Sequence, residues 1–155
     1  MNLLLEICLV LHITGITILT GTTLVNYVIS KQFWSNIRVD INRAIIINST
    51  TLTLRKITAI GGMLTVLSGI AMVALFHGAF NSLLWFRLKM IILLLIIANS
   101  LFVERPLNFK LKSLLPGNAN AVNELEAVKS KMNVYYLSQL TMLLIIFVLS
   151  IFRFN

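Results

Sequence analysis

The chain alternates between long apolar stretches and shorter polar ones, and this pattern predicts its elements. We place four apolar runs at residues 3–30, 57–76, 83–102 and 134–152. A helix needs about 20 predominantly apolar residues to cross the hydrocarbon core of a bilayer. The runs therefore predict an all-α integral membrane protein, a four-helix bundle that forms a single transmembrane domain over residues 1–155.

The connections between these runs differ in charge. The segments 31–56 and 103–133 each carry five Lys or Arg residues, whereas the segment 77–82 carries none. Short loops rich in Lys and Arg stay on the cytoplasmic side of a membrane. We therefore expect the first and third loops inside the cell, with both termini and the second loop outside. We also expect a short interfacial helix in the first loop and a helical lead-in to the last span over residues 120–132.

The composition narrows the function classes further. Hydrophobic residues make up 58% of the 155 residues and charged residues 12%, which excludes disorder and argues against an ordinary soluble enzyme. The net charge of +8 would suggest nucleic acid in a soluble protein, but here basic loops that fix the membrane topology explain it better, so no nucleic-acid partner is expected. The lone Cys8 forms neither an internal disulfide nor a cysteine zinc cluster.

Few ionisable residues interrupt the spans. Glu6 and Arg87 lie near span ends and reach the interface, whereas His12 and Lys89 lie deeper. At 1.5 Å per residue, His12 is about 13 Å and Lys89 about 9 Å from the outer start of its span. A central lysine costs roughly 2.5–3.5 kcal/mol on insertion scales, and ionisable residues inside a membrane are functional candidates by default. Because these two distances are similar, His12 and Lys89 are predicted to lie at matched depth in the outer half of the membrane.

This pair suggests a cofactor site with several alternatives. Histidine is the commonest metal ligand, and a lysine that burial keeps neutral can bind iron as well. We therefore predict a haem ligated by His12 and Lys89 between spans one and three, with His77 as the second choice of ligand. Alternatively Lys89 or Arg87 stays charged and pairs with a haem propionate. In the plainest reading His12 is a hydrogen-bonded packing residue and Lys89 extends to the headgroups.

Absent motifs limit the chemistry, and aromatic residues mark the predicted span ends. The chain has no phosphate-binding loop, no dinucleotide fingerprint and no CxxCH motif, so any haem is held without a covalent bond. Aromatic residues near the predicted span ends are expected to anchor the chain in the headgroup layer; they are Trp34, Trp85, Tyr135 and Tyr136.

Two segments resemble a known family. The residues LVLHITG at 9–15 and WFRLKMIILL at 85–94 resemble the first and third spans of the small bacterial HemJ-type membrane proteins and of the related CopD-like domain. The resemblance implies haem b at the positions of His12 and Lys89. It also implies oxidation of protoporphyrinogen IX, a porphyrin as partner, and a place in the bacterial inner (plasma) membrane. The alternative for a haem protein of this kind is electron transfer with a quinone as partner. Oxidase activity is less firmly implied than haem binding, because this chain has Ser100 where the family usually has a histidine late in span three.

The sequence leaves a second class of function open. The chain could instead be a non-catalytic accessory subunit, or a CopD-like copper-handling module. Cys8 and His12 are one helical turn apart, and copper favours such ligands. A homodimer in the lipid bilayer is compatible with all of these functions.

Overall fold

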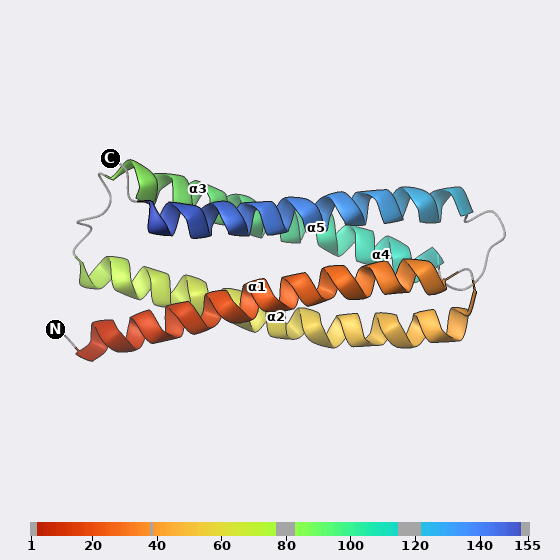
Figure 1. Cartoon of the computed structure of the whole chain (residues 1–155), viewed down its shortest axis with the longest axis horizontal. Helices are drawn as coiled ribbons and strands as arrows, with labels where there is room; N and C mark the ends of the chain where they lie inside the picture. The colour runs from red at the N-terminus through yellow and green to blue at the C-terminus, as the bar shows by residue number, and fades with distance from the viewer. Residues whose placement is uncertain (1–2, 38, 77–82, 115–121, 153–155) are drawn as a thin grey trace. The chain divides into compact units, whose positions relative to one another are not determined.

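The computed structural model of the protein describes residues 3–37, 39–76, 83–114 and 122–152. Nearly all of these residues are helical (Figure 1). The elements, in order, are α1 (Leu3–Asn36), α2 (Ile41–Leu75), α3 (Leu84–Asn99), η1 (Ser100–Glu104), α4 (Arg105–Leu114) and α5 (Val122–Ile151). Four helical stretches are long and apolar enough to cross a membrane. The prediction of an all-α membrane protein with four spans is therefore confirmed.

The chain divides into two compact units, Met1–Leu83 and Leu84–Asn155. The first contains α1 and α2, which form a helical hairpin. The second contains α3, η1 and α4 in one continuous helical stretch, with α5 packed along it. We refer to them as the first and the second hairpin and describe each by itself.

The helices continue well beyond the predicted spans on the basic side of the chain. Residues 22–60 contain neither Gly nor Pro, so the helical pattern meets no strong stop signal. Only residues 37–40 separate α1 from α2. Asp40 begins α2 as its N-cap, and its side chain accepts a hydrogen bond from the backbone N–H of Arg43 at 3.1 Å. The segment predicted as a short interfacial helix is therefore the first part of α2, and the predicted lead-in helix is the start of α5.

Two glycines let α1 and α2 approach closely. A Cβ atom added to Gly15 would lie 2.7 Å from the backbone nitrogen of Thr65, and one added to Gly61 would lie 2.9 Å from the backbone nitrogen of Leu19. Real Cβ atoms essentially never come this close to backbone. The helices therefore meet backbone to backbone at this level, as small residues allow in membrane proteins.

The second hairpin contains a π-helical turn whose cause is visible in the sequence. Pro106 lies two residues after the end of η1 and has no N–H for the carbonyl of Phe102, with which its ring would also clash in an α-helix. The backbone instead makes a wider turn, in which the N–H of Arg105 donates to the carbonyl of Ser100.

This turn changes which residues face α5. At about 100° per residue, an uninterrupted α-helix would turn Glu104 roughly 80° away from the buried Ile96. One additional residue in the turn sets this angle back to about 20°. Leu107 and Leu111 are buried beyond the turn, so the inward faces of α3 and α4 form one continuous stripe.

Candidate functional site

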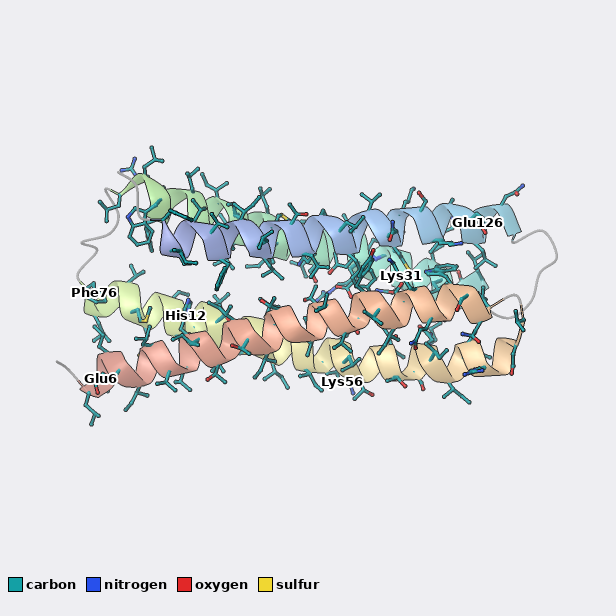
Figure 2. All side chains as sticks on the ribbon, in the orientation of Figure 1. Glu6, His12, Lys31, Lys56, Phe76 and Glu126 are labelled. Carbon is teal, nitrogen blue, oxygen red and sulfur yellow. The ribbon has the colours of Figure 1, made fainter. Side chains whose placement is uncertain are left out.

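His12 lies at the contact between α1 and α2 (Figure 2). Its Nδ1 atom is 2.9 Å from the carbonyl oxygen of Thr65 and 3.0 Å from the hydroxyl oxygen of Ser68. A carbonyl oxygen can only accept a hydrogen bond, so Nδ1 carries the ring proton and donates it. The neutral ring then has its lone pair on Nε2, the atom through which imidazole binds metals in this tautomer.

The residues around His12 hold the ring in one orientation. Ser68 is buried, and its hydroxyl donates to the carbonyl of Leu64 at 2.6 Å, so its oxygen faces His12 as an acceptor. A Cβ atom on Gly69 would lie 3.2 Å from Cε1 of the imidazole. The ring therefore sits against a position where any larger residue would press on it.

Lys89 lies on the second hairpin, so the predicted pair is divided between the two units. Its ammonium nitrogen is 4.7 Å from the centroid of the Trp85 ring, one turn back along α3. This cation–π contact stabilises the charged form of the side chain. Arg87 is exposed on the same helix, whereas Lys89 is half-buried. The geometry of Lys89 thus suits pairing with an anionic group better than ligation by a neutral amine.

The other predicted ligands are His77, as the second choice for haem, and Cys8, as a ligand for copper. His77 lies outside the described residues. Cys8 is half-buried on α1, one turn before His12. Among the described residues, no group of three His, Cys, Asp or Glu side chains is placed to hold a metal ion.

The second hairpin contains a polar cluster that the sequence did not point to. The carboxylate oxygen Oε2 of Glu104 accepts the hydroxyl of Tyr135 at 2.7 Å and that of Ser100 at 3.1 Å. Ser100 and Glu104 are the two ends of the π-helical turn, and Tyr135 comes from α5. The turn thus places an acidic side chain between two helices that cross a membrane.

A second set of contacts extends this cluster by one turn. The side-chain amide of Asn99 donates to the hydroxyl oxygen of Ser138 and to Oε1 of Gln139, both at 3.0 Å. Gln139 is only 4% exposed, and its Nε2 donates in turn to the carbonyl of Ile96 at 3.3 Å. Buried polar groups are costly unless they are paired, and here each of these amides finds a partner on the opposite helix.

The structure corrects the role predicted for two aromatic residues. Tyr135 and Tyr136 are 5% and 2% exposed and therefore lie in the packed interior, not in the headgroup layer. Because α5 begins twelve residues earlier than the predicted last span, they lie well inside the helix. Polar residues recur at helical spacing on both helices of the second hairpin, and this spacing could have predicted the cluster. The residues are Asn99, Ser100 and Glu104 on one side and Tyr135, Ser138 and Gln139 on the other. The π-helical turn that brings the two sets face to face is not evident from the periodicity of the sequence.

The chain matches no family model, no curated protein and no solved structure. The resemblance to HemJ-type and CopD-like proteins therefore stays a prediction, and the case for a function depends on the geometry of the individual side chains.

Proposed function

We propose that this protein binds haem b in the membrane, with His12 as the residue that would hold the haem iron through Nε2. The hydrogen bond from Nδ1 of His12 to the carbonyl of Thr65 is the observation that carries the proposal. Histidines that bind metals almost always donate their other ring N–H to a carbonyl or carboxylate, which fixes the tautomer and makes the ligating nitrogen more basic. One residue that fits the group is thus present, and its ring is oriented by the contact with Thr65.

Bound haem b would supply one-electron redox chemistry, in electron transfer with a quinone or in oxidation of a porphyrin. The chain itself contributes an apolar surrounding and positive charge. Lys89 and Arg87, near the start of α3, are suited to a carboxylate such as a haem propionate. The resemblance to HemJ-type proteins suggests the bacterial inner membrane as the location, and the loop charges favour an orientation with both termini outside the cytoplasm.

The test is the visible spectrum of the protein purified from haem-replete cells. A Soret band and the pyridine haemochrome spectrum of haem b are expected for the wild type. They should be lost in His12→Ala and kept in Ser68→Ala, which removes one contact of the ring but leaves the Thr65 carbonyl in place. A colourless, folded wild type would overturn the proposal.

A second candidate function is favoured by the same contacts. The imidazole joins α1 to α2 through Thr65 and Ser68, so His12 also suits a packing role in a non-catalytic accessory subunit. In that case His12→Ala loosens the first hairpin, and neither the wild type nor the variant contains haem. Metal analysis of the same preparation separates both readings from a copper protein, in which Cys8 would be the partner ligand.

A further inference from the structure

The helix α4 is amphipathic, and its two faces have different surroundings. Leu107 and Leu111 are buried. Arg105, Phe109 and Lys112 follow one another at spacings of four and three residues, which places them together on the opposite side of the helix. All three are exposed, and Phe109 is 80% exposed. We call these three residues the cationic face of α4.

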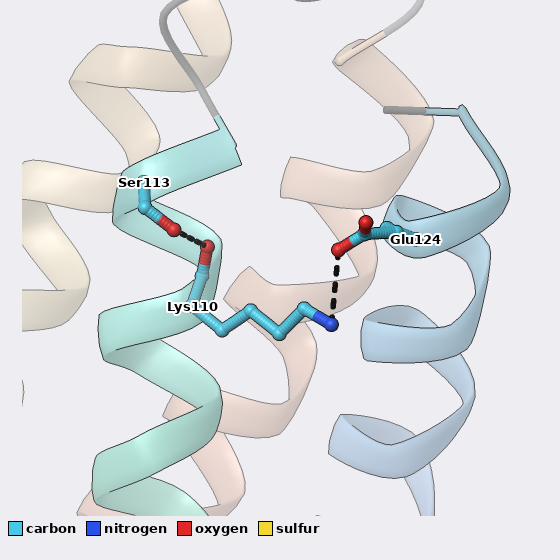
Figure 3. A network of polar contacts seen from close by, with 3 residues as sticks. All are labelled: Lys110, Ser113 and Glu124. Carbon is cyan, nitrogen blue, oxygen red and sulfur yellow. Dashed lines mark hydrogen bonds and ion pairs between the residues drawn. The ribbon is translucent and has the colours of Figure 1, made fainter. Parts of the chain in front are cut away.

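An ion pair joins α4 to α5 beside the buried leucines. The ammonium group of Lys110 lies 3.0 Å from a carboxylate oxygen of Glu124 on α5 (Figure 3). Both side chains are about half exposed, so the pair itself contributes little stability. The buried leucines therefore set which side of α4 turns toward α5, and the ion pair lies at the edge of that contact.

Helix lengths give the level of α4 relative to the membrane. Lys110 is 26 residues from the start of α3 and Glu124 is 27 residues from the end of α5, which at 1.5 Å per residue gives about 40 Å along either helix. The hydrocarbon core is about 30 Å thick, and the bilayer with its headgroups about 40–45 Å. By the same measure Arg105 is roughly 31 Å and Lys112 roughly 42 Å from the start of α3. The cationic face of α4 therefore spans the headgroup layer on the basic side of the protein.

We propose that the cationic face of α4 binds the headgroups of anionic phospholipids in the leaflet on the basic side. Arg105 and Lys112 are one turn above and below Phe109, so two phosphate-binding cations flank an aromatic ring within the same headgroup layer. Aromatic rings and basic residues are the side chains that favour this layer. Phosphate carries the complementary charge, and the leaflet at this level supplies it over the whole length of the face.

The experiment places a photoreactive benzoylphenylalanine at position 109, in vesicles with equal amounts of phosphatidylglycerol and phosphatidylcholine. A cation near an anionic surface is worth about a fivefold preference, so two cations predict cross-linking to phosphatidylglycerol in roughly 25-fold excess. In Arg105→Gln/Lys112→Gln the two lipids should react almost equally. The control Lys129→Gln/Lys131→Gln removes the same charge from exposed positions on α5 and should keep the excess.

Three results would overturn the proposal. The first is equal reaction with both lipids in the otherwise unchanged protein. The second is an equal loss of preference in the Lys129/Lys131 control, because the preference would then come from net charge and not from this face. The third is cross-linking at position 109 to a second copy of the chain, which would make the face a protein contact. If the double variant fails to fold, the proposal is still tested by the protein that keeps Arg105 and Lys112. In that protein, an excess of cross-links to phosphatidylglycerol supports the proposal and equal cross-linking to the two lipids contradicts it.

Discussion

The Nδ1 atom of His12 on α1 lies 2.9 Å from the carbonyl oxygen of Thr65 on α2. The hydrogen bond has two consequences. It joins the two helices of the first hairpin, and it places the ring proton on Nδ1, so that in the neutral ring the lone pair is on Nε2. The proposed haem ligand is thus part of the helix packing, so the effect of removing the ring on the fold must be separated from its effect on the cofactor.

Exogenous imidazole separates the two effects. His12→Gly should lose the Soret band, and free imidazole added during haem reconstitution should restore it, because the ligand is replaced without the chain. Ser68→Ala should keep the band without imidazole. A His12→Gly protein that keeps its haem with no imidazole present would show that the iron has another ligand.

Glycine substitutions test the close approach of α1 and α2. Gly15→Ala should destabilise the first hairpin by about 1–3 kcal/mol, since the new methyl group meets the backbone nitrogen of Thr65 and one of the helices has to move. Gly21→Ala is the matched control on the same helix. Nothing lies within 4 Å of its added Cβ, so it should be neutral or stabilise by about 0.5–1 kcal/mol through helix propensity. Thermal unfolding in detergent provides the comparison, and equal effects of the two substitutions would contradict this packing.

The contact between Tyr135 and Glu104 can be tested in the second hairpin. Tyr135→Phe removes the hydroxyl that donates to Glu104 at 2.7 Å and should cost about 1–2 kcal/mol of unfolding free energy, within the range found for hydrogen bonds between membrane helices and to charged groups. Ser150→Ala also removes one hydroxyl, but this exposed hydroxyl donates within α5 to the carbonyl of Ile146 at 2.7 Å and joins no two helices, so its effect should be below about 0.5 kcal/mol. Unfolding in detergent followed by circular dichroism measures both, and a neutral Tyr135→Phe would mean that the carboxylate does not need this donor.

The membrane topology has its own test, in a Cys8→Ser background. A cysteine at Val39, which is 85% exposed between α1 and α2, should react with impermeant maleimide only from the cytoplasmic side. A cysteine at Asn81, in the loop without Lys or Arg, should react only from the outside. The reverse labelling pattern would invert the orientation and would place the cationic face of α4 in the outer leaflet.

The sequence was sufficient to predict the number and type of the spans, because a bilayer is crossed by long apolar helices and the four apolar runs have the length that such helices need. It was insufficient for helix ends, since the largely polar residues 48–56 are compatible with either a loop or a helix when no Gly or Pro interrupts them. It was also insufficient for Glu104. That carboxylate reaches Tyr135 only because the π-helical turn shifts its face by about 100°, and a count at regular spacing does not include that shift.

For the candidate site, too, the sequence identified single residues better than the contacts between distant ones. The sequence identified His12 by its chemistry and its depth, but its partners Thr65 and Ser68 come from a helix more than fifty positions away. The contact between Lys89 and Trp85 is local, at a spacing of four residues, and was within reach of helical periodicity. It was overlooked because the tryptophan was interpreted only as a membrane anchor.

The role of Lys89 decides between the two forms of the haem proposal. An ammonium group that lies 4.7 Å from the centre of the Trp85 ring is stabilised as a cation, which favours pairing with a propionate over ligation of iron. Lys89→Ala should then leave the axial absorption bands unchanged and weaken haem retention by roughly ten- to a hundredfold, because a charge-assisted contact is worth about 1.5–3 kcal/mol. Lys89→Arg keeps the charge and should retain most of the affinity. Loss of a low-spin six-coordinate spectrum in Lys89→Ala would instead show that the amine binds the iron, and in that case Lys89→Met should recover a six-coordinate spectrum at a shifted potential.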